Sequence, residues 1–157
     1  KLYPATNDAV ALQSARDLTR DTTFGWSTWA WAQLQAKTGK SKVFMYYFNH
    51  KPPKATSKGA SHGSEMAYVF QNFTPDLMYT KSDHEISDAM ATYWTNFAKT
   101  GDPNGKGVPQ WPQFTDSYPK VMHFNDKPEA GGVANLPQLQ GVDAYMAWRR
   151  KQEQPIP

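Results

Sequence analysis

The sequence of 157 residues contains no cysteine, and this absence excludes several kinds of chemistry at once. Disulfide bridges, thiolate nucleophiles and cysteine-ligated metals all require that side chain. No apolar run approaches the roughly 18 residues of a membrane-spanning helix. The 17 basic and 14 acidic residues are spread along the chain, and no basic cluster alternates with aromatic residues. We therefore expect no membrane span and no nucleic-acid partner.

Aromatic residues, by contrast, are plentiful. The chain has six Trp, eight Tyr and eight Phe, and 39% of its residues are apolar. This composition excludes a disordered chain. The length fits one domain that buries a real core.

Helical patterns recur along the sequence. We expect helices after a cap at Asn7 or Asp8, over residues 21–37, over residues 83–100 and from about Asp143. The third is the clearest, because Ser82 and Glu85 have the spacing of a capping box and Gly101 follows its last turn. Its apolar face holds Ile86, Met90, Tyr93, Trp94 and Phe97.

Two segments are predicted as strands. Residues 43–48 form a continuous apolar run, which is typical of a strand covered on both faces, and residues 121–124 form a second, short strand. Helices on either side of a buried strand indicate an α/β fold. Two strands are too few for such a sheet. Either further strands escape the pattern, or the rest of the sheet belongs to another polypeptide.

None of the four histidines has a partner at metal-ligand spacing, so we expect no metal site. His84 is expected to be solvated on the first turn of its helix. His123 is expected to be structural, and His50 to hydrogen-bond to nearby backbone. His62 differs because it lies in a loop beyond a buried strand, between Gly59 and Gly63. Its residues alone leave both a catalytic and a structural role open.

The same loop also matches the nucleophile-elbow pattern G-x-S-x-G, with Ser61 as the serine. An elbow requires a sharp turn directly after a strand, whereas a Lys- and Pro-rich loop separates Phe48 from Gly59. Beyond the adjacent His62, the histidines that follow Ser61 are His84 and His123, and both are poorly placed to serve it. We therefore reject Ser61 as a nucleophile.

From Asp21 onward, the chain resembles the C-terminal third of the type-B carboxylesterase family, which includes cholinesterases and bacterial para-nitrobenzyl esterases. The matching stretches are Asp21-Thr-Thr-Phe, Tyr46-Tyr-Phe-Asn-His, Gly59-Ala-Ser-His-Gly-Ser-Glu-Met-Ala-Tyr-Val-Phe, Tyr93-Trp-Thr-Asn-Phe-Ala-Lys-Thr-Gly-Asp-Pro-Asn and Trp111-Pro.

This resemblance implies an α/β-hydrolase fold, with a mixed sheet covered by helices. Residues 1–157 would form the C-terminal fragment of a single domain. The family's Ser-Glu-His triad implies His62 as the catalytic histidine, whereas the serine and the acid would precede the region seen here. We expect no cofactor.

Further residues of the loop match family positions. Glu65 is implied to be a buried carboxylate that bonds nearby backbone and holds the histidine loop in shape. Ser61 and Ser64 are expected to line the substrate pocket. Cholinesterases carry larger residues at those positions, so a choline ester is disfavoured.

The predicted function is therefore part of a serine carboxylic-ester hydrolase, active only together with its N-terminal part and acting on a small-molecule ester. The family's habit favours a periplasmic or secreted bacterial protein. One alternative is a catalytically inactive, carboxylesterase-like binding or adhesion homologue. Another is a sugar-binding module using Trp94 and Trp111, but packing in the core explains both side chains more simply.

Overall fold

The computed structural model describes residues 1–57 and 59–152. It divides the chain into two compact units. The sheet unit, Ala36–Gly132, contains the strands and the predicted histidine loop. The helical unit consists of Lys1–Gln35 and the residues from Val133 onward.

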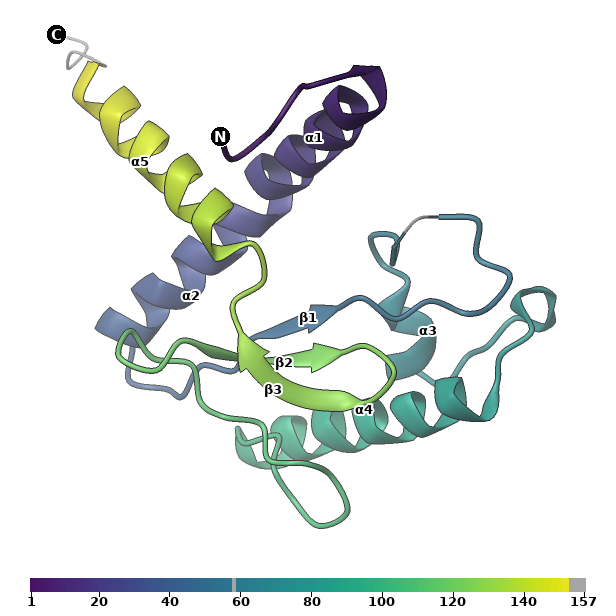
Figure 1. Ribbon diagram of the computed structural model, residues 1–157. Helices are drawn as coiled ribbons and strands as arrows, with labels where there is room; N and C mark the ends of the chain where they lie inside the picture. The colour runs from purple at the N-terminus through teal and green to yellow at the C-terminus, as the bar shows by residue number, and fades with distance from the viewer. Residues whose placement is uncertain (58, 153–157) are drawn as a thin grey trace, which may run out of the picture. The chain divides into compact units, whose positions relative to one another are not determined.

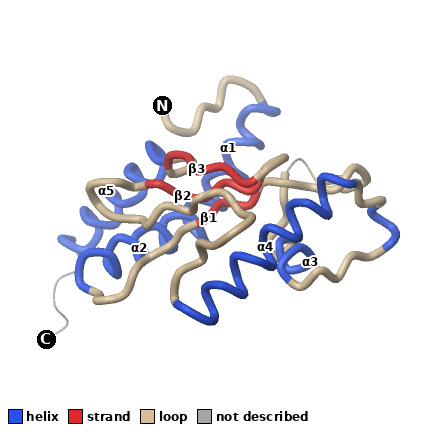
Figure 2. The backbone as a smooth tube through the Cα atoms, turned by 90° about the horizontal axis from the view of Figure 1, so that it is seen from below, coloured by secondary structure: helices blue, strands red, loops and turns tan. Residues whose placement is uncertain are grey.

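A three-stranded sheet in the order β1-β2-β3 lies at the centre of the sheet unit (Figure 1). Its strands are β1 (Tyr46–Phe48), β2 (Lys120–Phe124) and β3 (Pro128–Gly132). β1 runs parallel to β2, with Tyr46 opposite Met122, and β2 runs antiparallel to β3. The strands lie side by side in Figure 2 as well. The prediction of an α/β fold with a mixed sheet is therefore confirmed.

The first strand is shorter and less buried than predicted. Only Tyr46–Phe48 join the ladder, and all three residues are half-buried. The carbonyl of Val43 instead accepts the Phe114 N–H at 2.8 Å, and that of Met45 accepts the Met122 N–H at 2.9 Å. Met45 therefore still bonds to β2, whereas Val43 bonds to the loop that precedes β2 and lies outside the sheet ladder.

The third strand was not predicted. β3 consists of Pro128-Glu-Ala-Gly-Gly132, and these residue types are depleted in strands. Its pairing with β2 has Phe124 opposite Pro128 and Lys120 opposite Gly132. Proline is tolerated because it lies at the first position of an edge strand.

Two helices cover one face of this sheet. They are α3 (Glu65–Val69) and α4 (Lys81–Thr100), with a short 3₁₀ turn, η2 (Pro75–Leu77), between them. Met122 and Phe124 are two residues apart on β2 and therefore point to the same face. Both belong to one buried cluster with Tyr68 of α3 and with Met90 and Tyr93 of α4.

The capping box of α4 lies two residues earlier than predicted. Thr80 is the N-cap, and Asp83 is the acidic partner three residues later. The prediction of Ser82 and Glu85 is wrong; the Ser82 hydroxyl donates instead to the Asp126 carbonyl at 3.1 Å. Both pairs have the spacing of a capping box. They differ in that Asp83 is buried, whereas Glu85 is exposed. The helix ends before Gly101, whose φ of +74° suits glycine, as the sequence indicated.

Aromatic rings fill the space between helix and sheet. Trp111 is 4% exposed and meets Tyr93 at a centroid distance of 5.1 Å, and its Nε1 donates to the Met45 carbonyl at 3.1 Å. Trp94 packs against this cluster and meets the Tyr46 ring at 5.2 Å. Trp111 is a core residue and Trp94 packs against the core, so packing explains both tryptophans and the sugar-binding alternative loses its basis.

Most of the described residues of the helical unit lie in helices. They are α1 (Asp8–Arg20), the π-helical turn η1 (Asp21–Gly25), α2 (Trp26–Thr38) and α5 (Leu136–Gln152). The last residues of α2 extend into the sheet unit. Asn7 caps α1 by accepting the Val10 N–H at 3.0 Å, as predicted. The last helix begins earlier than the predicted Asp143.

The predicted helix start at Asp21 is a change of helix type rather than a new helix. At the end of η1, the N–H of Trp26 bonds to the Asp21 carbonyl, five residues back. The Asp21 side chain is buried and accepts hydrogen bonds from Tyr3 at 2.9 Å and Arg20 at 2.8 Å. Trp26 in turn donates to Asp143 of α5 at 3.0 Å.

Within the described part of the chain, no helix combines the length and the apolar character that crossing a membrane requires.

Candidate active site

His62 is exposed and lies in a turn of the loop that connects β1 to α3. Figure 1 shows this connecting loop. The connecting segment, residues 49–64, leaves the C-terminal end of β1, which is parallel to β2. In α/β folds, functional loops commonly follow the C-terminal ends of parallel strands. His62 thus lies on a loop that begins at the end of β1 and ends at the start of α3.

Backbone hydrogen bonds give the turn a defined shape. The Ser61 carbonyl accepts the Ser64 N–H at 3.1 Å, and the Gly63 carbonyl accepts the Met66 N–H at 3.1 Å. Gly63 has a φ of +83°, which side-chain-bearing residues rarely adopt. A Cβ at this position would meet only the end of the Met66 side chain, at 3.7 Å. Glycine is therefore needed here for its backbone conformation rather than for space.

The two serines beside His62 differ in their hydrogen bonding. Ser64 is half-buried, and its hydroxyl donates to the Ser61 carbonyl at 2.7 Å, within the turn. The Ser61 side chain is exposed. Their predicted role in lining a substrate pocket stays a prediction, and Ser64 has in addition a structural part in the turn.

Glu65 is the first residue of α3 and is half-buried. Its carboxylate meets the phenol of Tyr46 on β1. Burial, followed by the charge and hydrogen bonding of Glu65, raises the pKa of Tyr46 to about 12. The contact links the start of α3 to the sheet through a side chain, whereas the sequence predicted a bond to the backbone. That Glu65 supports the histidine loop remains a prediction.

A buried carboxylate near the site was missed by the sequence analysis. Asp83 is 1% exposed, and its Oδ1 lies 2.8 Å from Nε2 of His50 and accepts the Tyr68 hydroxyl at 2.6 Å. Its Oδ2 accepts the N–H of Thr80 at 2.7 Å and the Thr80 hydroxyl at 2.6 Å. We call these residues the Asp83 cluster: Asp83, His50, Tyr68 and Thr80.

The electrostatics of the Asp83 cluster follow from these bonds. Burial opposes ionisation of Asp83, but hydrogen bonds donated by Thr80, Tyr68 and His50 outweigh it and lower its pKa to about 2. Burial, together with the bond to this carboxylate and its charge, raises the pKa of the Tyr68 phenol well above its usual value. Asp83 is therefore an anion at neutral pH, and Tyr68 is a neutral donor to it.

The other histidines are not arranged around His62. His50 is bonded to the buried Asp83 side chain rather than to local backbone, so its expected role is wrong. His84 is exposed, as expected, and its ring contacts Phe73 at 5.0 Å. His123 has the expected structural role, because its Nε2 donates to the Gly132 carbonyl on β3 at 2.7 Å.

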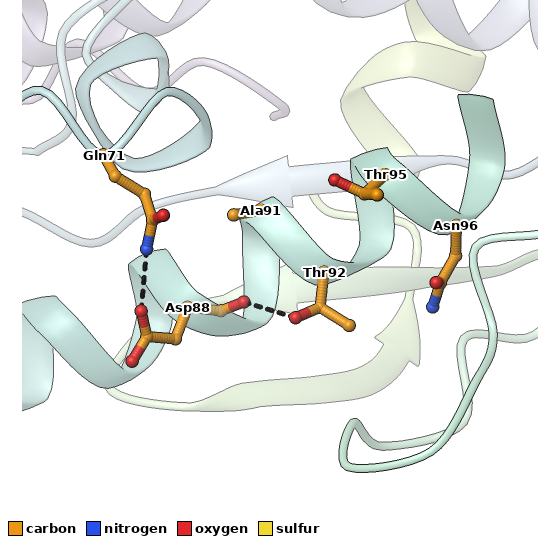
Figure 3. Close-up of a pocket in the computed structure, with 6 residues that line it drawn as sticks. All are labelled: Gln71, Asp88, Ala91, Thr92, Thr95 and Asn96. Atoms are coloured by element: carbon orange, nitrogen blue, oxygen red, sulfur yellow. Dashed lines mark hydrogen bonds between the residues drawn. The ribbon is translucent and has the colours of Figure 1, made fainter. Parts of the chain in front are cut away.

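One surface groove of the sheet unit is lined mostly by residues of α4 (Figure 3). The Gln71 amide donates to Asp88 at 2.7 Å, and the Thr92 hydroxyl donates to the Asp88 carbonyl at 2.8 Å. Its lining residues are Gln71, Asp88, Ala91, Thr92, Thr95 and Asn96. Neither His62 nor Glu65 contributes to it.

Known proteins resemble the chain over most of its length. The model of the Carboxylesterase family matches residues 3–142. Cocaine esterase of Homo sapiens is 32% identical over 108 residues, which are 64% of this chain and 19% of that protein. Acetylcholinesterase of Gallus gallus is 39% identical over 108 residues, covering 66% of this chain and 14% of the relative.

A solved structure that is similar to this chain is also that of an esterase. A PNB esterase superposes with a TM-score of 0.74 at 26% identity, over 90% of this chain and 28% of that one. The chain thus spans less than a fifth of the length of the two curated relatives. It has the fold of part of an α/β hydrolase, and it belongs to the carboxylesterase family.

Proposed function

We propose that the chain supplies the general base, His62, of a serine carboxylic-ester hydrolase. In this proposal, residues 1–157 are the C-terminal portion of one catalytic domain, and a preceding part carries the nucleophilic serine and the triad acid. The observation that carries the proposal is the exposed turn of His62 beyond a parallel strand. That turn lies within Gly59-x-x-His-Gly-x-Glu65, in a chain of the carboxylesterase family.

The chemistry is acyl transfer from an ester to water. One ring nitrogen of His62 accepts the proton of the serine hydroxyl as the serine attacks the ester carbonyl, and then returns it to the departing alcohol. The same exchange with water releases the acid. The second ring nitrogen donates to the triad acid, which fixes the tautomer. General-base catalysis contributes on the order of 10²–10⁴ in rate.

The surroundings suit this role. An exposed base is accessible to groups on another segment, and the turn that bears it is defined by hydrogen bonds from Ser64 and Met66. Glu65 ties the following helix to β1. Metal chemistry has no part in the proposal, and the described residues hold no cluster of three or more ligating side chains. The substrate is a small-molecule carboxylic ester.

The test uses the complete polypeptide that carries this sequence, with p-nitrophenyl acetate as substrate. We expect His62→Ala to lower kcat by at least about 100-fold, because it removes the base. His84→Ala is the matched control, since that histidine is also exposed and lies in the same unit. The proposal is wrong if the two variants have equal activity.

Labelling and isolation give two further tests. A fluorophosphonate probe is expected to label a serine in the complete polypeptide but none in the isolated 157-residue chain. If the complete polypeptide is not labelled, a non-catalytic binding or adhesion homologue is the better explanation. Hydrolysis of p-nitrophenyl acetate by the isolated chain, dependent on His62, would contradict the need for a preceding part.

A further inference from the structure

Both ends of the segment that carries His62 converge on one carboxylate oxygen. His50 is near the start of residues 49–64, directly beyond β1, and Tyr68 is in α3, just beyond their end. Oδ1 of Asp83 lies 2.8 Å from Nε2 of His50 and accepts the Tyr68 hydroxyl at 2.6 Å. The His50 and Tyr68 rings also contact each other edge to face, at 5.6 Å.

Capping of α4 does not account for this arrangement. The capping box of α4 uses Oδ2 of Asp83, which accepts both the N–H and the hydroxyl of Thr80. A side chain that only capped the helix would leave Oδ1 to solvent. Here Oδ1 is buried, and its two partners come from the two ends of the histidine segment. Charge-assisted bonds of this length are among the stronger hydrogen bonds in proteins.

Backbone contacts hold the same two points against the core. The Phe124 carbonyl of β2 accepts the N–H groups of Asn49 and His50, both at 3.0 Å. On the other side, the Ser87 hydroxyl of α4 donates to the Tyr68 carbonyl at 2.7 Å. The ends of the segment are thus fixed to β2 and α4, whereas His62 between them is exposed.

We propose that Asp83 is a positioning residue for His62, acting through its Oδ1 bonds to His50 and Tyr68. This inference rests on the proposed function, because it assumes that His62 is the base. A displacement of about 1 Å in a reacting group can cost on the order of 100-fold in rate. Fixing both ends of the segment that carries His62 to one buried anion limits such displacements. In this proposal, Asp83, His50 and Tyr68 act only through the position of the segment that carries His62.

The test compares variants that release the ends of the segment with one that weakens only the helix cap. Tyr68→Phe and His50→Leu each remove one donor to Oδ1, and His50→Gln retains a side-chain N–H that can reach it. Thr80→Ala removes the hydroxyl bound to Oδ2 and is the matched control. All are made in the complete polypeptide. The measurements are kcat and KM for p-nitrophenyl acetate, and amide hydrogen exchange of residues 59–64.

We expect Tyr68→Phe and His50→Leu to lower kcat about tenfold, with KM within about twofold, because the base is misplaced rather than the substrate site lost. Exchange of residues 59–64 is expected to accelerate in both variants. His50→Gln is expected to restore most of kcat. Thr80→Ala is expected to keep kcat within about twofold and to leave exchange of residues 59–64 unchanged.

The inference is overturned if Tyr68→Phe and His50→Leu match Thr80→Ala in both kcat and exchange, which would leave the cluster a purely structural role. Failure of the proposed function has a different signature. In that case His62→Ala retains activity, whatever the exchange of residues 59–64 shows. If His62→Ala is inactive and the two release variants have wild-type kcat, only the positioning role is refuted.

Discussion

His50 and His62 lie on one connecting segment, but in opposite surroundings. His50 is nearly buried, and its Nε2 is 2.8 Å from a carboxylate that is itself 1% exposed. His62 is exposed on a turn that has a glycine at φ +83°. The buried histidine contacts a buried carboxylate, yet the resemblance to the carboxylesterase family implies the exposed histidine as the catalytic one. If His62 is the base, as proposed, a histidine–carboxylate pair does not by itself mark a catalytic site, and accessibility to the reacting groups decides.

The largest expected effect on stability comes from the buried carboxylate that His50 contacts, Asp83. Asp83→Ala leaves the donors of His50, Tyr68 and Thr80 without their acceptor. We expect the free energy of unfolding to fall by about 3 kcal/mol. His62→Ala is expected to change it by less than about 0.5 kcal/mol, because that side chain is exposed. Urea unfolding followed by tryptophan fluorescence measures both, and equal losses would contradict the distinction.

The next largest effect is expected in the pH dependence of stability, which reports on the buried carboxylate. The pKa of Asp83 is lowered from 3.8 to about 2 in the folded chain, so its ionised form stabilises the fold above pH 3.8. This contribution, about 2 kcal/mol, is lost as the pH falls through 2. The difference in stability between wild type and Asp83→Asn is therefore expected to shrink between pH 4 and pH 2. A constant difference over that range would show that Asp83 has an ordinary pKa.

A smaller effect is expected in the turn itself. Gly63→Ala is expected to cost about 1 kcal/mol, because alanine is strained at a φ of +83°. Gly59→Ala is the matched control in the same segment. A Cβ there would meet Asn49 Oδ1 at 3.5 Å, which is an ordinary van der Waals contact. Thermal or urea unfolding compares the two, and an equal cost at both positions would contradict this explanation.

The smallest expected effect is that of the serine hydroxyl within the turn. Ser64→Ala removes the 2.7 Å bond to the Ser61 carbonyl and is expected to cost roughly 0.5 kcal/mol. Ser61→Ala, at an exposed neighbouring position, is expected to cost less. The same unfolding measurement resolves the pair. A larger loss in Ser61→Ala would reverse the assignment of the structural serine.

The sequence predicted what depends on local pattern. The long helix that became α4 was recognised from its apolar spacing and from Gly101, and the strand preceding the histidine loop from its continuous apolar run. The strand β3 was missed because its residues, Pro128–Gly132, have little preference for a strand and pair only because β2 lies beside them.

Tertiary contacts account for what the sequence could not show at the site. Thr80 with Asp83 and Ser82 with Glu85 have equal spacing, and only burial selects the first pair. The bond between His50 and Asp83 joins residues 33 positions apart, so no local pattern predicts it. The position of His62 in the chain was found through the family motif rather than from residue types alone. Its catalytic role stays a prediction.

The π-helical turn at Asp21–Gly25 has a consequence for the phase of the helix that follows. Its wider turn places one residue more between α1 and α2 than continuous α-helix would. One residue corresponds to about 100° of rotation. Deleting Thr23 would allow uninterrupted α-helix, but it would rotate Trp26 away from Asp143, its partner on α5. In this unit, the length of a single turn thus determines which side of α2 meets α5.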